Sequence, residues 1–274
     1  MSRDASLSTT QYVELRGNRF AYTQRGSGPV VISAHGLTSS RANNRIMGLS
    51  DFSEVLDAGR QLISYDARGH GESSGTRNAE DYSWADLAKD MLALADHFSP
   101  DAPVVGIGSS MGTGILLHAA SQRPDRFAAL ILTAPPTAWE TRADQAGIYR
   151  QMADLFESSE PDAVAALFAQ APVSVPPVFA NVPGYPAAPD ISFELLPTVF
   201  RGAGLSDLPP LALLSTLTQA TLILPWAGDP GHPVVTAQEL MSAMPNAQLH
   251  VTDTHEDLLT WGQRSAAFLG SHDL

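Results

Sequence analysis

The chain has 274 residues, of which 44% are hydrophobic and 16% are charged, values typical of a globular protein that buries a full core. It contains no cysteine, which excludes disulfides, thiolate metal sites and cysteine nucleophiles. The net charge of −13 disfavours nucleic-acid and membrane partners, because an acidic surface repels phosphate groups and anionic lipids.

The first residues, "MSRDASLSTT", lack the apolar segment of a secretory signal, and we therefore expect a cytoplasmic protein. The apolar stretch 209–228 is interrupted by polar residues and by Pro225, so we expect a helix end and a buried strand there rather than a membrane span. We also expect no cofactor and no metal, a small-molecule substrate, and a monomer or homodimer.

The predicted elements begin with two short alternating segments, 11–17 and 18–26, which we interpret as an N-terminal hairpin. Apolar runs without clean alternation follow, and such runs are typical of parallel strands that are covered on both faces. These runs begin at Pro29, Gln61, Pro103, Phe127, Ala220 and Ala247.

Helical patterns alternate with these apolar runs. Residues 83–98 carry apolar side chains at helical spacing, with Ser83 as the N-cap, and residues 111–122 and 234–244 are further helical candidates. The repeated order of strand and helix predicts an α/β fold with a mostly parallel, doubly wound sheet and right-handed crossovers.

The alternation stops between Pro135 and Leu217. Residues 145–158 and 162–170 look helical, and residues 171–190 contain six prolines, a density that forbids regular helix and interior strand. We therefore predict a core formed by residues 1–134 and 218–274, with residues 135–217 inserted as a helical, proline-rich cap.

The pattern G-x-S-x-G occurs twice, around Ser73 in "GESSG" and around Ser110 in "GSSMG". Ser73 lies in a polar stretch, whereas Ser110 lies between an apolar strand and an apolar helix, as a nucleophile elbow requires. The alternative for the second copy is a glycine-rich turn that holds a phosphate. Met111 replaces the third glycine of G-x-G-x-x-G and no P-loop lysine follows, so we predict Ser110 as a nucleophile.

A serine nucleophile needs a base and an orienting carboxylate. His255 follows the last predicted strand, at the end of the sheet where the elbow opens, and we select it as the base. His232 is a rival, but the prolines on both sides of it indicate a stiff turn and a structural role. Asp229 directly follows the strand that begins at Ala220 and is the predicted acid, with a turn-forming Asp-Pro as its alternative.

The other histidines fit the role of base less well. His118 lies on the helix after the elbow and points away from it, so we expect a structural histidine there. His250 lies within the last predicted strand and His272 lies in the tail. His35 precedes the serine, and we expect it to tie down its own loop by hydrogen bonds.

An acyl-transfer site also needs backbone N–H groups directed at the developing oxyanion. One donor is expected from Met111, which follows the nucleophile at the start of a helix whose dipole favours negative charge. The other is expected from Leu37, in the loop that follows the run beginning at Pro29.

Together, "HGLTSS", "DARGHGES", "GSSMG", "DPGHP" and "THEDLLTW" resemble the motifs of the α/β-hydrolase superfamily, in particular those of small cap-bearing esterases and enol-lactonases. The resemblance covers residues 31 to about 261. It implies Ser110 as nucleophile, Asp229 as acid, His255 as base, and Leu37 and Met111 as oxyanion donors. It also assigns "GESSG" to a turn whose Asp66, Arg68 and His70 are structural. Thr254 stands where the family usually has glycine before the histidine.

These residues predict a cofactor-independent serine hydrolase that cleaves a small carboxylic ester or lactone through an acyl-enzyme. Carbon–carbon bond hydrolysis and perhydrolysis use the same triad and stay open. Epoxide hydrolase and haloalkane dehalogenase chemistry would need an aspartate at position 110. A ligand receptor on the same scaffold is the alternative from another class. Trp139 and Tyr149 are candidate substrate-binding residues, unless they form the core of the cap itself.

Overall fold

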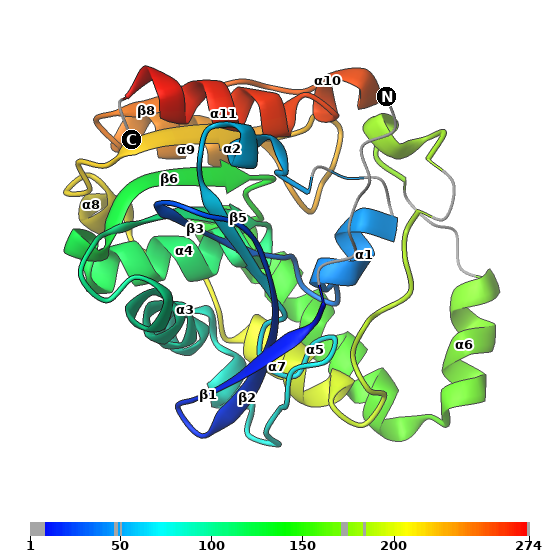
Figure 1. The fold of residues 1–274 in the computed structure, drawn as a ribbon. Helices are drawn as coiled ribbons and strands as arrows, with labels where there is room; N and C mark the ends of the chain where they lie inside the picture. Colours follow the sequence, from blue (N-terminus) through cyan, green and yellow to red (C-terminus); the bar gives the residue numbers. More distant parts are fainter. Residues whose placement is uncertain (1–8, 47–48, 50, 171–174, 183–184, 273–274) are drawn as a thin grey trace.

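The computed structural model describes residues 9–46, 49, 51–170, 175–182 and 185–272. Its centre is an eight-stranded sheet with the order β1-β2-β4-β3-β5-β6-β7-β8 (Figure 1). The strands are β1 (Gln11–Leu15), β2 (Asn18–Gly26), β3 (Val30–Ala34), β4 (Gln61–Tyr65), β5 (Val104–Ser109), β6 (Phe127–Thr133), β7 (Ala220–Leu224) and β8 (Ala247–Leu249).

The pairing of the strands matches the predicted topology. β1 and β2 form the N-terminal antiparallel hairpin, and β2 pairs antiparallel with β4. All the other neighbouring strands are parallel. Each of the six predicted apolar runs contains one of the strands β3 to β8, which confirms the mostly parallel α/β fold.

Helices cover both faces of the sheet (Figure 1). α3 and α4 pack against each other under one face, and α2 packs against α11 on the other. The α-helices are α1 (Arg41–Ile46), α2 (Glu54–Asp57), α3 (Trp84–Phe98), α4 (Met111–Gln122), α5 (Arg142–Ser158), α6 (Pro161–Gln170), α7 (Leu196–Gly204), α8 (Leu211–Leu214), α9 (Val234–Ala243), α10 (His255–Leu258) and α11 (Trp261–Ser271). Short 3-10 helices are η1 (Ala79–Tyr82), η2 (Pro124–Arg126), η3 (Trp139–Thr141) and η4 (Pro177–Phe179).

The apolar strands bury side chains on both sides, which explains why they lack a clean alternation. Along β6, Leu130 and Leu132 enter the core cluster beneath α3 and α4, whereas Ala129 and Ile131 enter the cluster beneath α2 and α11. A strand with two covered faces needs apolar side chains at every position. The sheet is therefore a rigid platform for the loops at its carboxyl end.

The predicted helices are also present. The hydroxyl of Ser83 accepts a hydrogen bond from the Asp86 amide and caps α3 as expected. The apolar stretch 209–228 forms α8 and β7, and no helix in the described part of the chain is long and apolar enough to cross a membrane.

A mainly helical segment joins β6 to β7. It contains η3, α5, α6, η4, α7 and α8. α5 and α7 pack together around a small apolar cluster that includes Ala153, Phe156 and Phe200. The helical prediction for 145–158 and 162–170 agrees with α5 and α6, but α7 was not predicted. Of the proline-rich stretch, residues 171–174 and 183–184 lie outside the described residues.

Candidate active site

Ser110 occupies a strained turn between β5 and α4. Its φ of 52° and ψ of −111° are unfavourable for a side chain with a Cβ, and its amide donates to the Thr133 carbonyl at 3.0 Å. A Cβ on Gly108 would lie 2.2 Å from the Gly112 oxygen, and one on Gly112 would lie 2.3 Å from the Ala34 oxygen. The two glycines of the pattern are therefore required for the close approach of α4 to the sheet.

The Ser110 hydroxyl begins a continuous chain of hydrogen bonds. Its Oγ lies 2.8 Å from Nε2 of His232, and Nδ1 of the same ring lies 2.7 Å from Oδ2 of Asp229. Because the carboxylate can only accept, Nδ1 carries a hydrogen and Nε2 accepts from the serine. A serine, an imidazole and a carboxylate in this order can perform nucleophilic and general-base chemistry.

The turn after β7 brings Asp229 and His232 together. Gly228 has a φ of 78°, which redirects the chain at the end of the strand. The Gly231 amide then donates to Oδ1 of Asp229 at 2.8 Å, and the His232 amide donates to the Asp229 carbonyl at 3.1 Å. These two bonds close a compact turn that presents the carboxylate and the ring on the same side.

The carboxylate of Asp229 is held in its charged form. Burial opposes its ionisation, but hydrogen bonds from His232, Trp226 and Gly231, together with the charge of His232, outweigh burial and lower the pKa of Asp229 to about 2. The side chain is 13% exposed. At neutral pH the residue is therefore an anion that can stabilise an imidazolium.

The hydrogen bonds differ from the predicted choice of base. They join Ser110 to His232, which was expected to have a structural role in a stiff turn, and not to His255. His255 instead opens α10, a short helix capped by the Thr254 hydroxyl. Its Nδ1 is buried without a hydrogen-bond partner in the described part of the chain. The signal that sequence reasoning undervalued is the spacing Asp-x-x-His within one turn.

Three other histidines have partners outside this chain of bonds. Nε2 of His118 lies 2.9 Å from the Asp207 carbonyl, and His35 bonds to the Gly36 carbonyl and the Ala67 amide, which confirms the structural expectation for both. His250 pairs with Asp257 at 2.7 Å.

The first copy of the pattern is structural. The Ser73 hydroxyl donates to the Asp66 carbonyl at 2.7 Å and accepts from the Ala21 amide at 2.9 Å. In the same turn, Arg68 makes two hydrogen bonds to the buried Asp90. Ser73 therefore joins this turn to β2 through hydrogen bonds to backbone groups.

The loop that was expected to supply an oxyanion donor lies beside the nucleophile. A Cβ on Gly36 would lie 3.4 Å from Cβ of Ser110 and 3.9 Å from its Oγ, and Leu37 is the next residue. The Met111 amide lies in the first turn of α4, where an N–H has no helical carbonyl partner. Both predicted donors thus adjoin Ser110.

The two aromatic residues proposed for substrate binding have different surroundings. The Trp139 indole donates to the Pro209 carbonyl at 3.1 Å, and its ring packs against the main core. Tyr149 on α5 lies 5.9 Å from the ring of Phe200. Burial and, to a smaller extent, the charge of Asp229 raise the pKa of Tyr149. Tyr149 is therefore within electrostatic range of the chain of hydrogen bonds.

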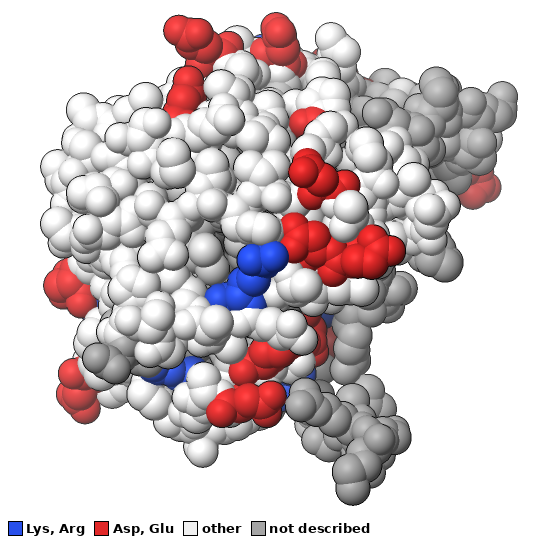
Figure 2. Space-filling model, turned by 90° about the horizontal axis from the view of Figure 1, so that it is seen from above, with Lys and Arg blue, Asp and Glu red and all other residues white. Residues whose placement is uncertain are grey.

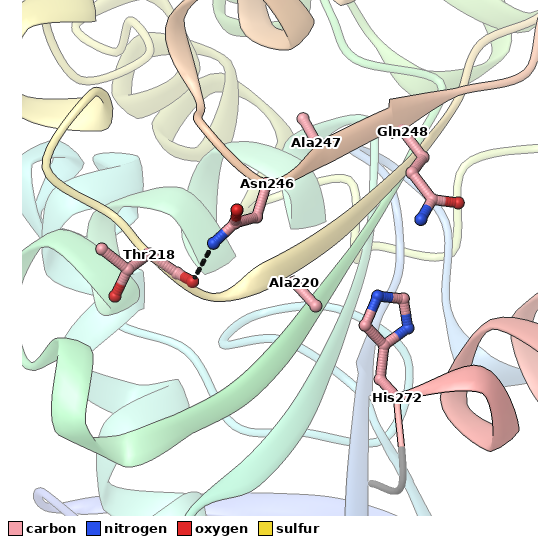
Figure 3. A pocket seen from close by; sticks show the side chains of 6 residues that line it. All are labelled: Thr218, Ala220, Asn246, Ala247, Gln248 and His272. Atoms are coloured by element: carbon pink, nitrogen blue, oxygen red, sulfur yellow. Dashed lines mark hydrogen bonds between the residues drawn. The ribbon is translucent and has the colours of Figure 1, made fainter.

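Among the described residues, one hollow lies at each end of the sheet. A cavity of about 20 Å³ adjoins the elbow and is lined by Ser109, Trp226 and Trp261 among others. A wider hollow of about 540 Å³ lies at the amino ends of β7 and β8 (Figure 3). Its lining residues are Thr218, Ala220, Asn246, Ala247, Gln248 and His272. It lacks a nucleophile with an adjacent base, and the lining of the smaller cavity does not include Ser110, His232 or Asp229.

The surface charge and the possible metal ligands bear on what else the protein could bind. Acidic side chains occur at many places on the face shown in Figure 2, and basic ones are few. Among the described residues, no group of three or more His, Asp or Glu side chains is arranged to hold a metal ion.

Comparison with known proteins agrees with this geometry. Residues 29–152 match the family described as alpha/beta hydrolase fold. The human mitochondrial palmitoyl-protein thioesterase ABHD10 is 33% identical over 107 residues, which are 39% of this chain and 33% of that protein. An epoxide hydrolase of Caballeronia sordidicola is 27% identical over 185 residues, 64% of this chain and 54% of that protein. The chain thus spans a third to about half of the length of these relatives.

Solved structures extend the likeness over the whole fold. A hydrolase from Pseudomonas aeruginosa aligns with a TM-score of 0.77 at 19% identity, over 97% of this chain and 100% of the other. An esterase from Exiguobacterium antarcticum aligns with a TM-score of 0.65 at 18% identity, over 96% and 99% of the two chains. With its sheet order, its elbow and this agreement with solved structures, the protein has the α/β-hydrolase fold.

Proposed function

We propose that the protein is a serine hydrolase that cleaves a small carboxylic ester or lactone through an acyl-enzyme. The observation that carries the proposal is the chain of hydrogen bonds from Ser110 through His232 to Asp229. The similar proteins support only the broader class of hydrolase, because two of them are named as a thioesterase and an epoxide hydrolase. The serine at position 110 favours acyl transfer over epoxide opening, for which an aspartate would be expected at that position.

In this proposal His232 is the base. As the Ser110 hydroxyl attacks the substrate carbonyl, its proton passes to Nε2 of His232, and Asp229 stabilises the imidazolium. The negative oxygen of the tetrahedral intermediate accepts hydrogen bonds from the amides of Leu37 and Met111. His232 then returns the proton to the leaving alkoxide. A water molecule, activated by the same ring, releases the acid and restores the serine.

We propose that the substrate is small, because the sequence motifs resemble those of small cap-bearing esterases and enol-lactonases. We also propose that the segment 135–217 acts as a cap, with Tyr149 on the substrate side.

Labelling with a fluorophosphonate probe tests the proposal, because such probes react with an activated serine. We expect labelling of the wild type and none of Ser110→Ala. The matched control is Ser73→Ala, which alters the other copy of the pattern and should label like the wild type once its fold is checked by thermal melting. Hydrolysis of a p-nitrophenyl ester should likewise be lost in Ser110→Ala and retained in Ser73→Ala. Labelling that persists in Ser110→Ala would overturn the proposal.

A further inference from the structure

Trp226 contacts two members of the chain of hydrogen bonds at once. Its indole N–H donates to Oδ2 of Asp229 at 2.9 Å, the same oxygen that accepts from Nδ1 of His232. Its ring lies 5.0 Å from the His232 ring at an interplanar angle of 66°, which is an edge-to-face contact. The residue is only 7% exposed. No motif in the sequence marks it for a role.

The position of Trp226 is fixed by the last two strands. The chain around it is bonded to Thr252, since the Ala227 amide donates to the Thr252 carbonyl and the Thr252 amide donates to the Pro225 carbonyl, each at 2.9 Å. Its ring is stacked on Trp261 of α11, with centroids 5.8 Å apart and planes 7° apart. The indole N–H therefore has little freedom to leave the carboxylate.

We propose that Trp226 is a positioning residue of the active site, which orients the Asp229 carboxylate and limits the basicity that this carboxylate confers on the His232 ring. The proposal rests on the function proposed above. Three N–H groups fix the carboxylate, because Gly231 holds Oδ1 while Trp226 and His232 share Oδ2. A donor that shares Oδ2 draws charge from it, so it weakens the attraction between Asp229 and an imidazolium.

In the described part of the chain, the charge of Asp229 acts on two phenols that stay neutral at the working pH. Tyr149 comes from α5, and Tyr185 comes from the loop after η4. Burial raises the pKa of both, to about 12 for Tyr185, and the charge of Asp229 adds to the rise. Arg142 lies next to Tyr149, with its guanidinium carbon 5.3 Å from the ring centroid. Burial lowers the pKa of Arg142, but a guanidinium starts so far above neutrality that it stays charged at the working pH. A change in the titration of His232 after a change at Trp226 is therefore attributable to Asp229.

Trp226→Phe is the decisive variant, because it keeps an aromatic ring and removes the N–H. We expect the acidic limb of the kcat/KM profile to move up by about half to one pH unit, since the imidazolium becomes more stable. We expect kcat to fall about tenfold with little change in KM, because the carboxylate loses a donor that orients it.

Trp261→Phe is the matched control. Its ring is stacked on Trp226, but its N–H donates to the Thr252 hydroxyl at 2.8 Å and does not reach the site. It removes the same atoms from the same aromatic cluster, so any effect of packing should appear in both variants. Only Trp226→Phe should move the pH profile. Equal shifts in both variants, or none in either, would overturn the proposal.

NMR separates this inference from the proposed function, because it needs no substrate. The titration midpoint of the His232 ring should rise in Trp226→Phe and not in Trp261→Phe, even if no ester is hydrolysed. If Trp226→Phe does not fold, the wild type still gives an answer. Its Trp226 indole N–H resonance should follow the His232 titration, while that of Trp261 should not. A Trp226 resonance that ignores this titration would contradict the proposal.

Discussion

Two loops at the carboxyl end of the sheet each carry a histidine paired with an aspartate. After β7, His232 lies 2.7 Å from Asp229, and after β8, His250 lies 2.7 Å from Asp257. The difference is in the next contact. His232 continues to the Ser110 hydroxyl, whereas Asp257 also accepts from Arg264 at 2.8 Å and ends in an ion pair.

The comparison teaches that a histidine–carboxylate pair does not by itself mark a base. Its neighbours decide, because only an imidazole with a free acceptor nitrogen next to a hydroxyl can take a proton from it. The loop after β7 meets the elbow of β5, since both follow parallel strands of the same sheet. The pair after β8 joins its loop to α11 and is a structural contact.

Replacing each of the two aspartates by asparagine should reveal the largest difference in function between the two loops. Asp229→Asn should lower kcat by about 10³–10⁴-fold, because an amide cannot stabilise the imidazolium and favours the wrong tautomer of His232. Asp257→Asn should change kcat by less than about twofold. Ester hydrolysis measured at one pH, with circular dichroism to check the fold, makes the comparison. Similar losses in both variants would abolish the distinction between the loops.

Much of this site follows from the sequence, and the part that does not has a physical reason. Ser110 could be identified because a strand and a helix on either side of it define the elbow. Asp229 could be identified because it follows a buried strand. His232 was set aside because prolines flank it, yet the turn is closed by Asp229 itself. Whether a side chain in such a turn faces the site depends on backbone angles, which residue types alone do not determine.

The rest of the fold also has parts that could be predicted from the sequence and parts that could not. The strands and the helices α3, α4 and α9 were predictable because their apolar patterns are regular over many residues. α7, between Leu196 and Gly204, was missed because Pro197 and three small residues obscure its pattern. Its stability comes from packing on α5, and tertiary contacts of this kind override weak local preference.

The stability of the protein at acidic pH tests the same comparison between Asp229 and Asp257, with a smaller expected effect. The pKa of Asp229 is about 2 in the folded protein, against an ordinary value of 3.8, so its ionisation stabilises the fold above pH 3.8. This contribution, about 2 kcal/mol before any discount for partial exposure, is lost as the pH falls toward 2. The difference in free energy of unfolding between wild type and Asp229→Asn should therefore shrink from pH 6 to pH 3.

Urea unfolding at these two pH values measures that difference. The difference in free energy of unfolding between wild type and Asp257→Asn should change less between the two pH values. The reason is that the Asp257 carboxylate is 24% exposed, against 13% for Asp229. A gap between wild type and Asp229→Asn that does not depend on pH would contradict the role of its ionisation.

The central claim is that the base lies in the loop after β7, and exchange of three histidines tests it most directly. His232→Ala, His255→Ala and His250→Ala are compared by their rates of fluorophosphonate labelling and by kcat/KM on a short-chain ester. We predict a loss of at least about 10³-fold in His232→Ala, and changes within about threefold in the other two. A large loss in His255→Ala together with near-normal rates in His232→Ala would contradict the account.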